Sequence, residues 1–469
     1  MRISKKIVLP LLWFVSNIVT AQTSRTAINS WVTTTNRDSL FKQQKHFLIF
    51  GKAAINKNPT IKINEKQTYQ TMDGFGFALT GGSARHIIKM VPASRTSLLK
   101  DLFATDGNSI GVSYLRVSIG ASDLNDKVFS YDDLPAGETD KNMQKFSLGP
   151  DTADVIPVLK EILAINPGIQ ILGSPWSPPT WMKTNNDTRG GRLKPEFYTA
   201  YANYFVKYIE SMKAAGIAID AITIQNEPLH PGNNPSLLLP APDEAEFIKN
   251  HLGPAFKAAN IKTKIIIYDH NADRPDYPIT ILNDTAAAKY IDGSAFHLYG
   301  GDIENLAPVH EAYPNKNLYF TEQMVVEKPG SKQIDISWPV KHLLIGATRN
   351  WCRIVLLWNL AADPQNKPFT DRGGCDACQG AVTIDSNKFT RNAAYYVIAH
   401  AAKFIRPGSV RIASNELDAL PNVAFKTPQG KKVLIVLNNS NTAQAFNISY
   451  NGLIVNATLS AGAISTYEW

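Results

Sequence analysis

The sequence feature that most constrains the fold is an alternation of short apolar segments with helix-length amphipathic stretches, repeated over roughly residues 70 to 400. This alternation is typical of parallel βα units. Eight segments have the length and composition of strands, and they span residues 74–79, 113–118, 169–174, 221–225, 264–268, 294–298, 317–321 and 354–358. Eight such units predict an α/β protein built on a closed (β/α)8 TIM barrel.

Helices are predicted between the strands, at residues 154–165, 196–215 and 243–259, with Asp243 as the N-cap of the third. A doubly wound open sheet is the alternative fold. However, the first strand is not followed by a G-x-G-x-x-G sequence, and Gly74-Phe-Gly76 leads to Thr80-Gly-Gly-Ser83 without phosphate-loop spacing. The barrel is therefore favoured.

The pattern changes after Arg406-Pro-Gly408 to strands that are separated by turns and not by long helices. These strands are predicted at residues 423–427, 431–437, 443–450, 454–459 and 463–469. They predict a side β-sandwich, and an early strand at 60–64 with no helix after it is expected to join them. The expected domains are a barrel at 70–405 and a sandwich made of 22–69 plus 406–469.

Residues 1–21 resemble a signal peptide, with a basic start, an apolar stretch from Ile7 to Val15 and small residues up to Ala21. Cleavage after Ala21 would make the protein secreted or periplasmic. A buried N-terminal helix is the less favoured reading. The apolar stretch is too short to span a bilayer, and no later segment reaches about 18 apolar residues, so no integral membrane segment is expected in the mature chain.

Charge and cysteine content exclude several classes of protein. The chain has 48 Lys and Arg against 40 Asp and Glu, and no basic run is interleaved with aromatic residues, so nucleic-acid binding is not expected. Three cysteines are too few for a disulfide framework. Cys375 and Cys378 are expected to form a loop disulfide or to be free thiols, because no second ligand pair at zinc spacing follows them.

Two glutamates mark the expected active site. In a TIM barrel the functional side chains lie at the carboxyl ends of the strands. Glu227 ends the fourth predicted strand and Glu322 ends the seventh. Two facing carboxylates are what glycosidic bond cleavage requires, one as a proton donor and the other as a nucleophile or base.

The other strand ends carry side chains suited to sugars. Aromatic rings pack on the apolar faces of pyranoses, and carboxylates and amides bind hydroxyls. The residues concerned are Arg116, Asp123, Trp176, Trp181, Asp269, His270, Asn271, His297, Tyr299, Trp358 and Asn359. His270 and His297 lack metal-ligand spacing, so neither a metal nor another cofactor is expected. Arg116 is expected to support the carboxylates, as is His297.

These motifs together resemble glycoside hydrolase family 30. The resemblance covers roughly residues 70 to 410 and is carried by Gly74-Phe-Gly76, Leu115-Arg-Val117, Ser174-Pro-Trp-Ser-Pro-Pro-Thr-Trp-Met-Lys-Thr184, Asn226-Glu-Pro228, His297-Leu-Tyr299, Thr321-Glu322, Trp358-Asn-Leu-Ala361 and Lys403-Phe-Ile-Arg-Pro-Gly-Ser409. It implies a retaining enzyme with Glu227 as acid/base and Glu322 as nucleophile. It also implies a sugar subsite lined by Asp123, Trp176, Asn226, Tyr299 and Trp358.

The resemblance implies a secreted retaining hydrolase of β-glucosidic bonds, of a glucosylceramidase-like kind, acting on a carbohydrate or glycolipid. An endo-β-1,6-glucanase is the alternative within the enzyme class. The loop at 363–380 departs from the glucosylceramidase pattern, and it is expected to rim the leaving-group side. A non-catalytic carbohydrate-binding protein is the alternative from another class, although binding alone does not need paired carboxylates.

Overall fold

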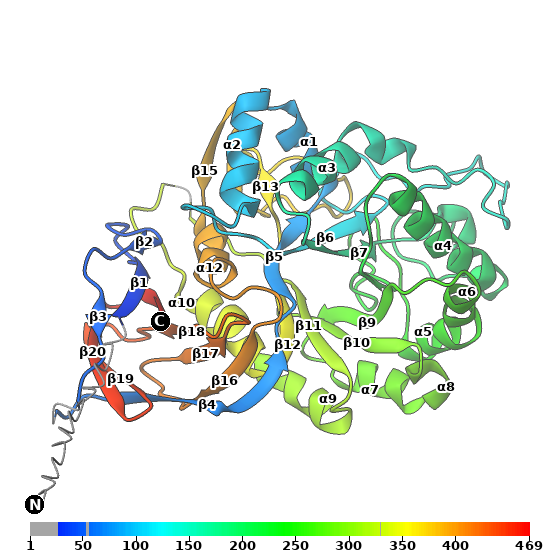
Figure 1. Ribbon diagram of the computed structural model, residues 1–469. Coiled ribbons are helices and arrows are strands. Elements are labelled where there is room, and N and C mark those ends of the chain that lie inside the picture. Colours follow the sequence, from blue (N-terminus) through cyan, green and yellow to red (C-terminus); the bar gives the residue numbers. More distant parts are fainter. Residues whose placement is uncertain (1–26, 53–55, 329) are drawn as a thin grey trace, which may run out of the picture.

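The computed structural model describes residues 27–52, 56–328 and 330–469, so the predicted signal peptide lies outside the described residues. Its largest unit is a closed barrel of eight parallel strands (Figure 1). The strands are β5 (Gly74–Leu79), β6 (Tyr114–Ile119), β7 (Gln170–Pro175), β8 (Ala221–Thr223), β9 (Lys264–Asn271), β10 (Ile291–His297), β11 (Asn317–Glu322) and β12 (Cys352–Leu357). The predicted fold class is confirmed.

The barrel strands are apolar along their whole length because both of their faces are buried. Alternate residues point into the barrel and fill its interior, among them Tyr114, Leu172, Ile266, Tyr319 and Leu356. The residues between them point outward and pack under the surrounding helices. This double burial is what a parallel sheet covered by helices requires.

Helices surround the barrel on its outside (Figure 1). They are α1 (Gly81–Lys89), α2 (Pro92–Phe103), α3 (Val155–Ile165), α4 (Tyr198–Ala214), α5 (Ala241–Phe247), η4 (Ile248–Leu252), α6 (Gly253–Ala258), α7 (Asp276–Asn283), α8 (Thr285–Ala288), α9 (Ala307–Ala312), α10 (Ser337–Pro339), η6 (Val340–Gly346), α11 (Ala347–Arg349) and α12 (Ala393–Ala402). The predicted N-cap was wrong: α5 begins at Ala241 after Pro240, which puts Asp243 inside the first turn. Pro242 lies in the same first turn, where a missing backbone N–H costs no intrahelical hydrogen bond.

The second unit is a β-sandwich assembled from both parts of the chain that flank the barrel. Its strands are β1 (Ala27–Thr33), β2 (Lys42–Gln43), β3 (Leu48–Ile49), β4 (Thr60–Thr71), β16 (Val410–Ser414), β17 (Asn422–Lys426), β18 (Lys432–Leu437), β19 (Gln444–Tyr450), β20 (Leu453–Leu459) and β21 (Ile464–Glu468). The early strand β4 pairs with β16 and β19. Strand β1, which sequence analysis did not identify, pairs with the last strand, β21.

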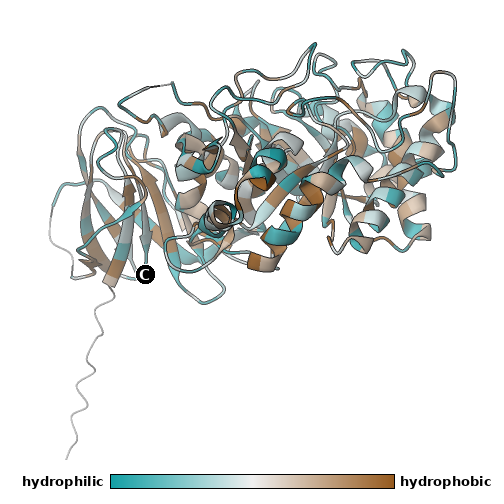
Figure 2. Cartoon of the chain, turned by 90° about the horizontal axis from the view of Figure 1, so that it is seen from above, coloured by the Kyte–Doolittle hydropathy of each residue, from teal (hydrophilic) through white to brown (hydrophobic). Residues whose placement is uncertain are grey.

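The sandwich packs against the side of the barrel (Figure 2). In β18, Val433, Ile435 and Leu437 belong to the core shared with the barrel, whereas Leu434 and Val436 belong to the core inside the sandwich. The period of two residues gives this strand one buried face on each side. Within the described residues, no helix is both long and apolar enough to cross a membrane.

Candidate active site

A cavity of about 250 Å³ opens at the carboxyl ends of the barrel strands. Larger cavities occur elsewhere on the molecule, but Glu227 and Glu322 both line this one. The lining residues are Asp123, Glu227, His230, Asn233, His270, Asn271, Tyr299, Glu322, Met324, Trp358, Cys375 and Cys378. Such a mixture of carboxylates, amides and aromatic rings suits a sugar.

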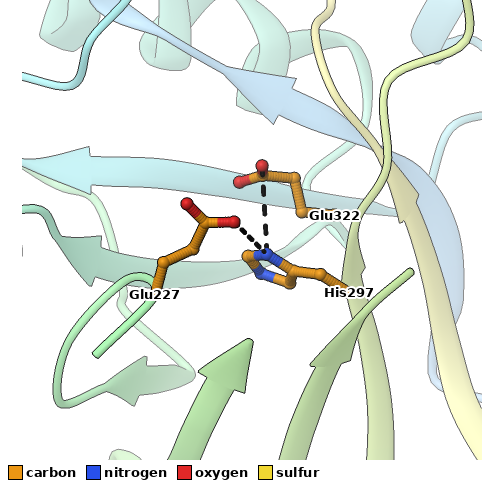
Figure 3. Close-up of side chains that lie close together, drawn as sticks. All are labelled: Glu227, His297 and Glu322. Atoms are coloured by element: carbon orange, nitrogen blue, oxygen red, sulfur yellow. Dashed lines mark hydrogen bonds and ion pairs between the residues drawn. The ribbon is translucent and has the colours of Figure 1, made fainter. Parts of the chain in front are cut away.

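Two glutamates face each other in this cavity (Figure 3). One carboxylate oxygen of Glu227 and one of Glu322 lie within 4.8 Å of each other, and a ring nitrogen of His297 lies within the same distance of both. Glu227 is 8% exposed and Glu322 is 6% exposed. A separation of about 5 Å between carboxyl groups is the geometry of retaining glycosidases.

Glu322 lies at the end of β11 and is held by an ion pair. Arg116 Nη1 donates to Glu322 Oε2 at 2.5 Å, and the Tyr299 hydroxyl donates to Oε1 at 3.0 Å. These two contacts fix the carboxylate from two sides and stabilise its charged form.

Glu227 follows β8 and has weaker partners. Asn233 Nδ2 donates to Glu227 Oε2 at 3.0 Å, and His297 Nδ1 lies 3.4 Å from Oε1. The backbone of Glu227 is left-handed, with φ of 47°, and its N–H donates to the carbonyl of Asp269. A left-handed glutamate is strained, and such strain is often found at functional sites.

Beneath the glutamates, Asp269 joins several strand ends into one buried network. Its Oδ2 accepts hydrogen bonds from Arg116 at 2.8 Å, Ser174 at 2.6 Å and Thr223 at 2.7 Å. Its Oδ1 accepts from Thr321 at 2.6 Å and lies 3.2 Å from His297 Nε2. Burial by itself would raise the Asp269 pKa, but Arg116 and His297 outweigh it and hold that pKa well below its ordinary value.

The electrostatics of the site depend on His297. Burial disfavours its charge, but Glu322, Asp269 and Glu227 outweigh that effect and raise the imidazole pKa to about 9. Burial would raise the Glu227 pKa too, yet the hydrogen bond and charge of protonated His297 lower it to about 2. Burial raises the pKa of Glu322 in spite of His297 and Arg116. Glu227 and Glu322 therefore both compete with His297 for the proton that the imidazole carries.

Asp123 is a third acidic side chain in the cavity. It is 6% exposed. Burial, followed by the charges of Glu322 and Glu227, raises its pKa to about 8. At neutral pH this side chain is mostly a neutral acid, which can donate a hydrogen bond to a hydroxyl as well as accept one.

The predicted site residues fall into two groups. Asp123, Glu227, His270, Asn271, Tyr299, Glu322 and Trp358 line the cavity, whereas Arg116, Trp176, Asn226, Asp269 and His297 do not. Behind the cavity, Asn226 Oδ1 accepts from Arg116 at 2.6 Å, which leaves the amide NH₂ as its free donor group.

Trp176 also lies behind the cavity and does not line it. It is 2% exposed, packs on Trp358 with a ring-centroid distance of 5.4 Å and lies 4.8 Å from the Arg116 guanidinium. It therefore holds Trp358 and Arg116 in place.

Sequence reasoning missed His230, Asn233 and Met324 as lining residues. His230 and Asn233 belong to the loop between β8 and α5, which was treated only as a connection. The length and polarity of this loop could have identified His230 and Asn233, because long loops after barrel strands usually contribute to the site.

The loop at 363–380 closes one side of the cavity, and a disulfide joins Cys375 to Cys378 there. Asn234 donates to Asp371, and Arg372 forms an ion pair with Asp187. Cys378 Sγ lies 3.8 Å from the sulfur of Met324. The disulfide thus belongs to the wall that Trp358 and Met324 form.

Glu227, His297 and Glu322 are also a possible ligand set for a metal ion. Their surroundings argue against that use, because the Arg116 guanidinium contacts Glu322 and His297 is protonated at neutral pH. Positive charge is therefore already supplied by side chains. The arrangement fits acid/base and nucleophilic chemistry at a sugar.

Comparison with known proteins agrees with this geometry. The family model of the glycosyl hydrolase family 30 TIM-barrel domain matches residues 72–405, and that of the family 30 β-sandwich domain matches residues 408–467. The endo-1,6-β-D-glucanase of Neurospora crassa is 36% identical over 77% of this chain and 76% of its own. The lysosomal acid glucosylceramidase of Mus musculus is 31% identical over 87% of this chain and 83% of its own.

A solved structure of an endo-β1,6-glucanase superposes with a TM-score of 0.87 at 34% identity, covering 94% of this chain and 99% of the other. The matched regions include the barrel and the sandwich, and they contain both facing glutamates. The chain belongs to glycoside hydrolase family 30 and is a β-glycoside hydrolase that acts on carbohydrate.

Proposed function

We propose that this enzyme hydrolyses β-1,6-linked glucan with retention of configuration, using Glu322 as nucleophile and Glu227 as acid/base. The observation that carries the proposal is the pair of buried carboxylates within 4.8 Å of each other in one cavity. That separation leaves no room for a water between a base and the sugar, which an inverting mechanism needs.

In the first step, Glu322 attacks the anomeric carbon while Glu227 protonates the departing glycosidic oxygen. Arg116 and Tyr299 keep Glu322 charged and oriented for the attack. The products of this step are a glycosyl ester on Glu322 and a free leaving group. In the second step Glu227, now a base, takes a proton from water, and that water releases the sugar as the same anomer.

His297 supplies the proton that Glu227 needs. Transfer of its Nδ1 proton over the 3.4 Å contact leaves a neutral imidazole and a neutral Glu227. With His297 neutral, the charge that lowers the Glu227 pKa is gone, and burial beside ionised Glu322 favours the protonated acid. The buried charges of Arg116, Asp269 and Glu322 then sum to one negative charge, as they did before the transfer.

The preference for β-1,6-glucan rests on the relatives. The endo-1,6-β-D-glucanases of Neurospora crassa and Trichoderma harzianum are 36% and 33% identical to this chain, and the endo-β1,6-glucanase structure covers nearly all of it. Glucosylceramide is the second candidate, favoured by the 31% identity to the mouse enzyme. Export through the predicted signal peptide belongs to the proposal, since a glucan polymer lies outside the cell.

Product analysis tests the substrate. Parallel incubations contain a β-1,6-glucan, glucosylceramide in detergent and an aryl β-glucoside, with Glu322→Gln as the blank. Oligosaccharides released from the glucan support the proposal. Glucose released from the ceramide with no action on the glucan would replace it with the second candidate.

Proton NMR of the first product tests the mechanism. A β-anomer formed first from a β-glycoside is expected, because two displacements restore the configuration. An α-anomer formed first would overturn the retaining assignment. Glu322→Gln is expected to bind sugar without turnover, which separates catalysis from mere carbohydrate binding.

A further inference from the structure

The two walls of the active-site cavity differ in chemistry. Around Glu227 stand His230 and Asn233, from the loop after β8, and His270 and Asn271, at the end of β9. A second group of lining residues consists of Met324, Trp358 and the disulfide of Cys375 with Cys378. One wall therefore offers hydrogen bonds and the other offers apolar and sulfur surface.

The position of the acid identifies the leaving-group side. A general acid must reach the glycosidic oxygen directly, so the leaving group lies beside Glu227. Asn233 touches Glu227 with its NH₂ group, and the His230 N–H donates to the Glu227 carbonyl at 2.9 Å. The polar wall is therefore on the leaving-group side.

His270 is the most informative residue of the polar wall. It is 7% exposed, and among the described residues its Nδ1 has no hydrogen-bond partner. Burial lowers its pKa to about 4, so the ring is neutral at neutral pH. Because Nδ1 is enclosed and unpaired, Nε2 is the ring nitrogen that is open to the cavity. An N–H at Nε2 is a donor that can form a hydrogen bond with an acceptor on a ligand.

The backbone before His270 is distorted in a way that aims this ring. Tyr268 and Asp269 are both left-handed, with φ of 75° and 60°, and the pairing of β9 with β10 shifts register between Ala295 and Phe296. A regular strand would send Asp269 and His270 to opposite faces. The irregularity instead brings Asp269 into the buried network and His270 into the cavity wall.

We propose that His230, Asn233, His270 and Asn271 form a subsite for a sugar on the leaving-group side, in which His270 Nε2–H donates to a hydroxyl of that sugar. Asn233 adds a free acceptor oxygen, because its NH₂ is used on Glu227. Asn271 adds a free NH₂, because its oxygen accepts from the Tyr299 N–H at 3.0 Å. Donors and an acceptor at fixed places suit a hydroxylated ring and not a lipid tail. This inference rests on the proposed function.

His270→Phe tests the subsite by comparing two leaving groups. On a β-1,6-linked glucose disaccharide, kcat/KM is expected to fall about tenfold, because a hydrogen bond to the leaving sugar is lost. On an aryl β-glucoside, whose leaving group has no hydroxyls to bind, kcat/KM is expected to stay within about twofold. His270→Gln, which keeps an N–H donor, is expected to recover part of the loss.

The matched control is His342→Phe. This histidine lies in η6, far from the cavity in sequence and fold, and packs against Trp338. It is expected to leave both substrates unaffected. Equal losses of His270→Phe on both substrates would overturn the inference, since they would mean an effect on Glu227 and not on the leaving group. No loss on either would overturn it too.

A transfer experiment separates this inference from the proposed substrate. The enzyme is glycosylated with the aryl β-glucoside, and methyl β-glucoside is added as an acceptor that competes with water. Transfer is expected to saturate with acceptor in the wild type and to fall several-fold in His270→Phe, with aryl glucoside hydrolysis retained. Equal transfer by both would overturn the subsite. A wild type that transfers sugar but leaves β-1,6-glucan intact would overturn only the proposed substrate.

Discussion

At the scale of single residues, the site depends on a buried arginine. Arg116 is fully buried and touches Glu322, Asp269 and Asn226 at once, so it balances the negative charge of two carboxylates. The desolvation of this cluster is costly and is offset only while every partner is present. Single-residue changes therefore test charge balance as well as catalysis.

Arg116→Met is expected to destabilise the protein by roughly 3–5 kcal/mol and to abolish hydrolysis, because two buried carboxylates lose their counter-ion. Urea unfolding and kcat/KM on an aryl β-glucoside measure the two effects. Arg372→Met is the control. Its ion pair with Asp187 is half-exposed, so its loss is expected to change stability little. A similar loss in both variants would contradict the central role of Arg116.

His297→Gln is expected to narrow the pH profile of kcat/KM from both sides. Protonated His297 lowers the pKa of Glu322, so its removal moves the acid limb, where Glu322 must lose its proton, to higher pH. The alkaline limb of the wild type reports loss of the proton that His297 shares with Glu227, and it moves to lower pH when Glu227 must hold that proton alone. Maximal activity is expected to fall about tenfold or more, because a charge-assisted hydrogen bond is lost. An unshifted profile would contradict the proton route through His297.

At the scale of elements, sequence periodicity was sufficient for the barrel and insufficient for local irregularities. All eight strands were predictable because burial on both faces makes them continuous apolar runs. The glutamates at the ends of β8 and β11 followed from the same reasoning. The bend at Tyr268 and Asp269 could not be predicted, since left-handed backbone at tyrosine and aspartate depends on tertiary contacts.

The sugar-facing role of Trp176 stays a prediction, but its absence from the cavity lining shows the same limit. The type of residue suited the prediction, but its packing behind Trp358 is set by how neighbouring strand ends stack. Strand β1 was missed because its neighbour β21 lies at the other end of the chain. Local patterns carry no information about such a distant partner.

The disulfide loop allows a prediction at this scale. The double variant Cys375→Ser, Cys378→Ser is expected to raise KM several-fold, because the wall against Met324 and Trp358 loosens. Stability is expected to fall by only about 2 kcal/mol, since the ring that the disulfide closes is short. Dithiothreitol is expected to reproduce the effect in wild type and to do nothing to the variant. A response of the variant to dithiothreitol would contradict this account.

At the scale of the whole molecule, the contact between barrel and sandwich contains a buried histidine. His400 of α12 lies between Thr33 of β1 and Thr466 of β21, 2.9 Å from each hydroxyl, and is fully buried. Burial lowers its pKa to about 3. The contact between the two units therefore requires a neutral imidazole.

Stability is expected to fall as the pH falls from about 6.5 towards 3. In that window the unfolded chain protonates His400 and the folded protein does not, so the loss is about 1.4 kcal/mol per pH unit from this group. Above pH 6.5 the contribution is constant. His400→Gln removes the titration, and urea unfolding at pH 7.5 and 5 is expected to give a smaller difference than in wild type. Equal differences would contradict the assignment.

The pairing of β1 with β21 has a consequence for how the protein is made. Asn29 lies opposite Glu468, although the whole catalytic barrel separates them along the chain. During synthesis β1 emerges first and has to wait until the barrel and β21 have been made before its neighbour exists, so closure of the sandwich follows synthesis of the barrel. The same proximity favours a circular permutant: a short linker could join the two ends, and new termini could be opened in an exposed barrel loop.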